Sequence, residues 1–230
     1  REGFARMTRG VQRLRERDRA GVVTISSAPS IAAKWLVPRL ERFNAAHPEI
    51  DVRLSASREL VDFRSDDVDA AMRFGPGRYP GLVAEKLFDD AVMPVCSPRL
   101  LHGAHPLKLP EDLRHHVLLH DESLNPDPAT PDWATWVKAA GVAGVDPGRG
   151  PRLSHAELAV QAANDGVGVV LGRQALIAAD LAAGRLVAPF ALSIPATFAY
   201  YLVYPEGAIE RPKVAAFRNW ILAEAAAQAA

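Results

Sequence analysis

The segment VTISSAPSIAAKWLVPRLERF, from Val23 to Phe43, decides the fold class of this chain. Its apolar start predicts a buried strand over Val22–Ser26, and the amphipathic stretch that follows predicts a helix through Phe43. The His47-Pro48 turn then ends that helix, because a residue before proline disfavours helical geometry. A strand that passes directly into a helix is the first half of a βαβ unit, so the segment predicts an α/β fold.

The same alternation continues to the C-terminus. The first half predicts strands at 51–55, 68–74 and 87–95, with a short helix at 60–64. The second half predicts helices at 133–141, 154–165, 173–183 and 212–230, and strands at 167–171, 186–187 and 198–204. The chain is therefore expected to form two α/β halves with a mostly parallel sheet, and the closing helix could belong to either half.

Pro38 interrupts the first predicted helix. A proline inside a helix removes one backbone hydrogen bond and kinks or breaks the turn before it. Either the segment bends at Pro38, or a regular helix starts near Val37 and Ile31–Leu36 forms a looser turn.

Composition excludes several classes of protein. The 230 residues are 49% hydrophobic with zero formal net charge and a pI near 7.2, so the chain as a whole has no nucleic-acid footprint. Its one cysteine, Cys96, cannot form an internal disulfide, which fits a reducing cytoplasm. No apolar run is long enough to span a membrane, so we expect a cytoplasmic protein without membrane contact.

Basic residues are concentrated at the N-terminus, where residues 1–19 hold seven arginines and three acidic residues. Phe4, Met7, Val11 and Leu14 follow helical a/d spacing there. This pattern is typical of a seam with a partner helix, and it also fits a helix lying on its own domain. Ala20-Gly21 separates the segment from the first strand.

Motifs for catalysis, metals and cofactors are weak. The run GVGVVLG, residues 166–172, follows a helix and enters a strand, whereas a dinucleotide loop leads from a strand into a helix. The histidines between His102 and His120 match no zinc spacing, and Cys96 fits a small buried thiol. The acidic pairs Asp89-Asp90 and Asp121-Glu122 are interpreted as solvated loop or cap residues. We therefore expect no enzyme, cofactor or metal ion.

Two serines stand where α/β sheets usually bind ligands. Ser30 lies between the first strand and its helix, and Ser154 opens a helix with Glu157 three residues later, as in a capping box. Each serine can cap its helix or turn its hydroxyl toward a ligand. Free backbone N–H groups at such helix starts suit a carboxylate or phosphate.

Five stretches together resemble a known family, and they span most of the chain. They are APSIAAKWLVPRLERFNAAHPEIDVRLSAS (28–57), DDVDAAMRFGPGRYPGL (66–82), FDDAVMPVCSPRLL (88–101), LLHDE (118–122) and SHAELAVQAANDGVGVVLGRQAL (154–176). They resemble the effector-binding domain of LysR-type transcriptional regulators, in the branch of the glycine-cleavage activator.

The resemblance implies two Rossmann-like lobes around a cleft, as in type 2 periplasmic binding proteins. Lobe I would hold residues 21–97 and 201–230, and lobe II residues 98–200, with crossings near Cys96-Ser97 and Tyr200-Tyr201. Residues 1–20 would be a dimerisation linker helix. The family's N-terminal winged helix-turn-helix is absent from this sequence, so DNA binding is expected only through that missing domain.

The resemblance also implies an effector site between the lobes. Its expected contacts are Pro29, Ser30, Ser57, Arg73, Phe74, Asp121, Ser154, His155, Phe198 and Tyr200. A small anionic or zwitterionic metabolite is the expected ligand, and a homodimer or homotetramer the expected assembly. Two alternatives are a solute-binding protein of a transport system, against which the basic helix counts, and an enzyme, for which no motif was found.

Overall fold

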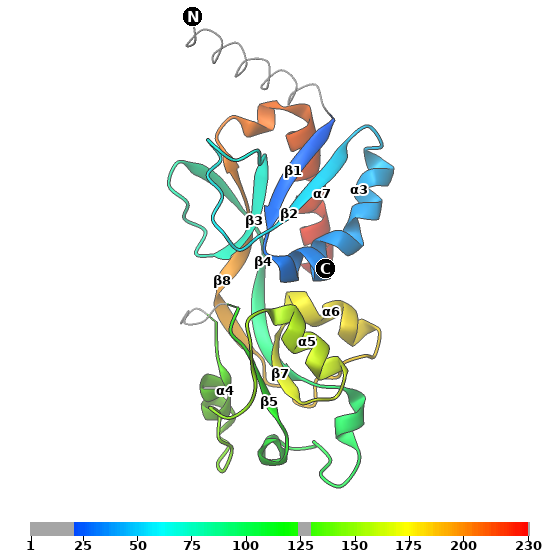
Figure 1. Ribbon diagram of the computed structural model, residues 1–230, viewed down its shortest axis with the longest axis vertical. Helices are drawn as coiled ribbons and strands as arrows, with labels where there is room; N and C mark the ends of the chain where they lie inside the picture. The colour runs from blue at the N-terminus through cyan, green and yellow to red at the C-terminus, as the bar shows by residue number, and fades with distance from the viewer. Residues whose placement is uncertain (1–20, 124–129, 230) are drawn as a thin grey trace, which may run out of the picture.

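The computed structural model describes residues 21–123 and 130–229 of the chain, so the predicted linker helix lies outside the described residues. One sheet of eight strands, in the order β2-β1-β3-β8-β4-β7-β5-β6, runs through both halves of the molecule. Figure 1 shows two lobes joined by the long strands β4 and β8. The α/β fold class with two lobes is confirmed.

The strands are β1 Val22–Ser27, β2 Asp51–Ala56, β3 Ala70–Gly75, β4 Leu82–Val95, β5 Leu118–Asp121, β6 Arg152–Leu153, β7 Val169–Arg173 and β8 Ile194–Pro205. The α-helices are α2 Pro29–Ile31, α3 Leu40–Ala46, α4 Trp133–Ala140, α5 Ala156–Asn164, α6 Gln174–Ala182 and α7 Pro212–Ala229. Shorter helical turns are η1 Ala32–Leu36, η2 Val37–Arg39, η3 Pro98–Leu101, η4 Pro110–His115 and η5 Ala208–Glu210.

The sheet is parallel at its two ends and antiparallel in its middle. Strands β2, β1 and β3 are parallel in lobe I, and β7, β5 and β6 are parallel in lobe II. Strand β8 runs antiparallel to β3 and β4, and β4 runs antiparallel to β7. The sheet is therefore mixed and not mostly parallel as predicted, because every pair that β4 or β8 makes is antiparallel.

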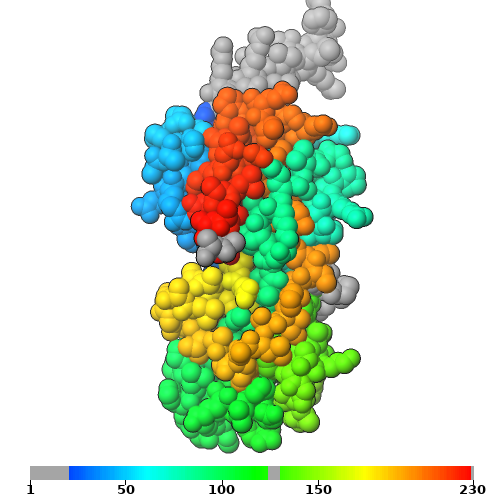
Figure 2. All heavy atoms as spheres, turned by 180° about the vertical axis from the view of Figure 1, so that it is seen from behind, coloured from blue at the N-terminus to red at the C-terminus, as the bar shows by residue number. Residues whose placement is uncertain are grey.

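Lobe I has its core between the sheet and the helices α3 and α7. Val23 and Ile25 of β1 are fully buried and belong to the same apolar cluster as Phe43, Phe217 and Ile221. Figure 2 shows α7 across the back of lobe I, with its last turns close to the helices of lobe II. The closing helix thus packs against β1 and α3 in this apolar cluster.

The helical segment after β1 is irregular where Pro38 requires it. It passes from α2 into a π-helical turn, Ala32–Leu36, then a 3₁₀ turn, Val37–Arg39, before α3 begins. The amide of Val37 donates to the carbonyl of Ala32, the wide spacing of a π turn. The looser turn before Pro38 is therefore confirmed, and the regular helix starts a few residues later than Val37.

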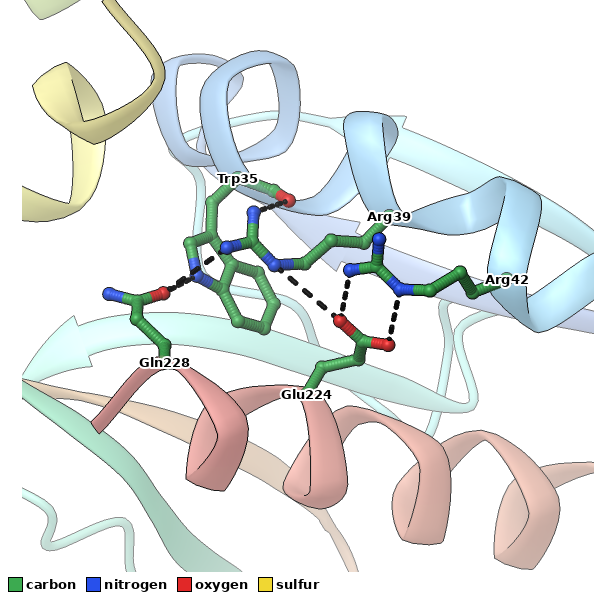
Figure 3. A network of polar contacts seen from close by, with 5 residues as sticks. All are labelled: Trp35, Arg39, Arg42, Glu224 and Gln228. Atoms are coloured by element: carbon green, nitrogen blue, oxygen red, sulfur yellow. Dashed lines mark hydrogen bonds and ion pairs between the residues drawn. The ribbon is translucent and has the colours of Figure 1, made fainter. Parts of the chain in front are cut away.

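Figure 3 shows how α7 is fastened to this irregular segment. Arg42 and Arg39 both pair with Glu224 on α7. The indole of Trp35 donates to the side chain of Gln228, and the guanidinium of Arg39 lies 4.5 Å from the centre of the Trp35 ring. Helix α7 is thus held against the π turn through its last two turns.

Lobe II packs helices on both faces of its sheet. Val169 of β7 belongs to the apolar cluster of Trp133 and Trp136 from α4, whereas the next residue, Val170, belongs to that of α5 and α6, which includes Ile177. Side chains alternate between the faces of a strand, so Leu171 and Arg173 share the α4 face.

Strands β4 and β8 change partners as they pass between the lobes. Strand β4 pairs with β8 from Leu82 to Val92, with register shifts before Phe88 and after Asp89, and it pairs with β7 from Val92 to Val95. The passage of β4 thus lies around residues 88–92, ahead of the crossing expected at Cys96-Ser97. No helix within the described ranges is long and apolar enough to cross a membrane.

Three local predictions were wrong. Residues 60–64 form no helix; a turn held by the Asp62 side chain, which accepts from the amide of Arg64 at 3.0 Å, takes its place. The strand expected at 186–187 is a single bridge between Val187 and Cys96. Asp89 and Asp90 lie inside β4 rather than on a loop, and Asp90 is buried.

Candidate functional site

Arg173 brings together residues from both lobes where the connecting strands cross. It lies at the end of β7, and its Nη1 donates to the Tyr200 hydroxyl of β8 at 3.1 Å. Its Nη2 lies 3.5 Å from Ser123 Oγ and 3.8 Å from Asp121 Oδ2. The guanidinium carbon is 5.5 Å from the ring centre of Phe74, on β3 of lobe I. We call these five residues the Arg173 cluster.

The guanidinium of Arg173 is buried, and one of its N–H donors has no hydrogen-bond partner among the described residues. The side chain is 7% exposed, and this donor is its Nε. Burial by itself would lower the pKa of Arg173, but Tyr200, Asp121 and Asp90 outweigh it and raise the pKa. The group is therefore a buried cation with an unused donor, and such a group is costly unless an anion pairs with it.

Asp90 occupies the start of helix α6 beside this cluster. Its Oδ1 accepts from the amides of Ala91 at 3.0 Å and Ala175 at 3.2 Å, while its buried Oδ2 has no partner in the described part of the chain. Burial raises the pKa of Asp90, partly offset by Arg173. Asp90 thus accepts a free amide at the start of α6, within one turn of Arg173 at the helix N-cap.

Aromatic rings line the lobe I side of the cluster. The ring of Phe74 lies 5.0 Å from Tyr200 and 5.8 Å from Phe198, and Phe88 lies 5.0 Å from Tyr200. These contacts bring the expected residues Phe74, Phe198 and Tyr200 together. Burial raises the pKa of Tyr200, so its hydroxyl stays neutral and accepts the Arg173 hydrogen bond.

Arg73 holds the loop after β2 in place. Its Nη2 donates to Ser26 Oγ at 2.9 Å and to the carbonyl of Glu59 at 3.2 Å, and Ser57 Oγ accepts from the Glu59 amide at 3.1 Å. From this loop Arg58 reaches lobe II, where it donates to the carbonyl of Ser123 and, at 3.4 Å, to that of Ser154. Arg73 and Ser57 thus shape a contact between the lobes.

The predicted serine caps were wrong at both helices. Ala28 is the N-cap of the first helix, Pro29 its first residue and Ser30 its second, so the Ser30 side chain cannot act as the cap. Ser30 is 6% exposed, and the start of this helix has no side-chain cap hydrogen bond. Proline at the first helical position has a suitable fixed φ and lacks an N–H, which reduces the need for a cap.

At the second helix, His155 is the N-cap, without a side-chain cap bond. The Ser154 hydroxyl instead lies 2.9 Å from His155 Nδ1, and the expected capping box with Glu157 does not form. Neither the Ser30 hydroxyl nor the Ser154 hydroxyl therefore caps a helix. Among the described residues, Pro29, Ser30 and His155 form no hydrogen bond or ion pair with the Arg173 cluster.

A cavity opens into lobe II from the Arg173 cluster, with a volume of about 660 Å³. It is lined by Val92, Leu119, His120, Asp121, Glu122, Thr130, Pro131, Asp132, Trp133, Ala134, Thr135, Pro147, Gly148, Arg152, Leu171 and Arg173. Its size is within the range of small-molecule sites. Among residues 21–123 and 130–229, no group of His, Cys, Asp and Glu could hold a metal ion.

Sequence reasoning missed Arg173, Ser123 and Arg58. The signal for Arg173 was present in the segment 154–176, where it follows a buried strand and precedes a helix, as Ser30 nearly does in lobe I.

The family comparison decides the identity of the domain. The LysR substrate binding domain family matches residues 16–226, which is most of the chain. The chain belongs to the LysR family. The described LysR domain is similar to the glycine cleavage system transcriptional activator of Escherichia coli K12, with 44% identity over 99% of this chain and 72% of the relative.

Two further similarities agree with this result. The transcriptional activator AmpR of Pseudomonas aeruginosa is 34% identical over 90% of this chain and 67% of the relative. The solved effector domain of that regulator superposes with a TM-score of 0.73, covering 90% of this LysR domain and 97% of the solved chain. These relatives are transcriptional activators, so the regulator interpretation is supported over the solute-binding protein. The chain is the effector-binding domain of a LysR-type transcriptional regulator.

Proposed function

We propose that this LysR domain binds a small anionic or zwitterionic effector between its lobes, with Arg173 as the anchor for the anionic group. The single observation that carries the proposal is the buried guanidinium whose Nε has no partner among the described residues. A carboxylate placed there would pair with a cation that the protein has already desolvated. The Arg173 guanidinium also contacts Tyr200 on a connecting strand and Phe74 in lobe I.

We propose that the other expected residues contact the effector around Arg173. Phe74, Phe198 and Tyr200 supply an aromatic wall, and Asp121 offers a carboxylate for a positive group. The Ser30 side chain, which does not cap its helix, supports Ser30 and Pro29 as part of the site. Ser154 and His155 lie where Arg58 touches lobe II, and Ser57 and Arg73 position that loop.

Signalling would follow from a change in the angle between the lobes. An effector shifts this equilibrium only by its difference in affinity for the two lobe arrangements. In the full-length regulator, this shift would re-set the spacing of DNA-binding domains in a homodimer or homotetramer. Because the relatives of this domain are transcriptional activators, we place the regulator in the cytoplasm, where the DNA is. We assign it no catalytic activity.

Thermal unfolding against a panel of amino acids, dicarboxylates, aromatic acids and purines tests the anchor. A ligand at 100 times its Kd should stabilise the folded domain by about 2.7 kcal/mol. Arg173→Met should abolish this shift, whereas Arg53→Met, at a 66% exposed arginine, should keep it. A shift of equal size in Arg173→Met would refute the anchor.

Ser30→Ala separates a ligand contact from a structural role. Because the Ser30 hydroxyl makes no cap bond, the variant should keep the melting temperature of the free domain and lose part of the ligand-induced shift. A lower melting temperature with an unchanged shift would remove Ser30 from the site.

A further inference from the structure

Arg58 belongs to lobe I, but its side chain ends on lobe II. Its guanidinium donates to the carbonyl of Ser123 and, at 3.4 Å, to that of Ser154. Ser123 follows strand β5 and Ser154 follows β6, so both acceptors lie at the carboxyl ends of lobe II strands. Arg58 itself follows the carboxyl end of β2. The side chain therefore joins strand ends of the kind at which open α/β sheets bind their ligands.

This contact is distant, in strand order, from the strands that link the lobes. In the order β2-β1-β3-β8-β4-β7-β5-β6, the lobes are linked through β8 and β4, whereas β2 and β6 are the outermost strands of lobes I and II. Arg58 follows one outermost strand, and Ser154 follows the other. A rotation of one lobe about the linking strands displaces the outer strands most, so opening the lobes requires the Arg58 contact to break.

The loop that carries Arg58 is fastened to lobe I on both sides of this residue. The amide of Ser57 donates to the carbonyl of Ser27 at 2.9 Å, and the Ser57 hydroxyl accepts from the amide of Glu59 at 3.1 Å. Arg73 Nη2 donates to the Glu59 carbonyl at 3.2 Å. The Arg58 backbone thus moves with lobe I. Only a rotation of the lobes or a change of side-chain conformation can separate its guanidinium from lobe II.

The contact is weak enough to open and close. Arg58 is exposed, both acceptors are neutral backbone carbonyls, and no carboxylate of residues 21–123 or 130–229 forms an ion pair with it. A guanidinium binds a carboxylate more strongly than a neutral carbonyl, and water competes for an exposed donor. Because both acceptors are protein atoms, the contact needs no ligand to form.

We infer that Arg58 is a strap that holds the lobes closed at the mouth of the effector cleft and releases lobe II before an effector enters. The inference rests on the proposed function, because it takes the space between the lobes as the effector site. It adds a regulatory step to that function. An effector binds only the molecules in which the strap is open, so Arg58 lowers the apparent affinity by the fraction that is closed.

Distances between nitroxide labels on the two lobes test the strap without any ligand. Arg53→Cys on β2 and Lys138→Cys on α4 place one label on an exposed position of each lobe, and the fully buried Cys96 should stay unlabelled. In pulsed electron paramagnetic resonance, Arg58→Met should raise the ratio of open to closed distances about fivefold, as expected for the loss of a modest hydrogen bond. The matched control is Arg64→Met, at an exposed arginine of the same loop whose amide contacts Asp62, and it should leave the ratio unchanged.

The outcomes separate the strap from the anchor. Identical distance distributions in Arg58→Met and the unmodified domain, or an equal change in Arg64→Met, overturn the strap. If the ligand-induced thermal shift still requires Arg173 in that case, the proposed function stands without the strap. If Arg58→Met opens the lobes but Arg173→Met keeps the full thermal shift, the strap holds and the anchor fails.

Discussion

Lys34 in lobe I and Asp180 in lobe II form an ion pair across the lobe boundary, with Nζ 2.9 Å from Oδ2. Lys34 belongs to the π turn before Pro38, and Asp180 to helix α6. The Asp180 side chain is 2% exposed and also accepts from Arg185 Nε at 2.7 Å. The irregular helix of lobe I thus contacts the helix whose start carries Arg173.

Lys34→Met should lower the free energy of unfolding at pH 7 by about 1–3 kcal/mol, because it removes one partner of a buried carboxylate. Burial would raise the pKa of Asp180, but hydrogen bonds from Lys34 and Arg185 outweigh it and lower the pKa. The contribution is therefore present above the unfolded carboxyl pKa and lost as pH falls through the lower folded pKa. Urea unfolding measures it, with Lys138→Met as the exposed control. Equal stabilities at pH 7 would contradict the pair's role.

Glu224→Gln should lower the free energy of unfolding by about 1 kcal/mol at neutral pH, because it weakens the ion pairs that hold α7 in Figure 3. The hydrogen bond from Arg42 is the main cause that lowers the pKa of Glu224, and Arg39 adds to it. Because the folded pKa is lowered, the difference in free energy of unfolding between the unmodified domain and the variant is fully present above the unfolded pKa of the carboxyl. It is lost as the pH falls through the lower folded pKa. Urea titrations at neutral and acidic pH show this; a difference independent of pH would argue against the ion pairs.

Gly172→Ala should destabilise lobe II by about 1–3 kcal/mol through overpacking. An added Cβ would lie 2.6 Å from Ile177 Cγ2 and 3.0 Å from Val95 Cγ2. Gly148→Ala, whose Cβ would meet only Asp146 Oδ1 at 3.5 Å, is the matched control and should change stability little. Thermal unfolding of both variants decides whether Gly172 serves close packing.

Cys96 should react slowly with a disulfide reagent such as dithionitrobenzoate at pH 8. The side chain is fully buried, and burial raises its pKa to about 11, so little thiolate is present. Denaturant should restore fast labelling. Rapid reaction of the native domain would show that β4 opens locally at its end.

Long periodic segments were predictable because their pattern is local. The strand at 22–26, the tryptophan helix at 133–141 and helix α7 were all found with small shifts of their ends. The predicted helix at 60–64 failed because the Asp62 side chain stabilises a turn there. The capping box at Ser154 failed because that hydroxyl contacts the neighbouring His155 instead.

The sequence by itself determined the α/β class, the irregular helix before Pro38 and the family, since each depends on residues close together along the chain. Only the tertiary structure decided the site. Arg173, Tyr200, Phe74 and Asp121 come from four different strands, and they meet because β4 and β8 cross between the lobes. The burial that leaves Arg173 with an unused donor depends on distant segments, so no local pattern could reveal it.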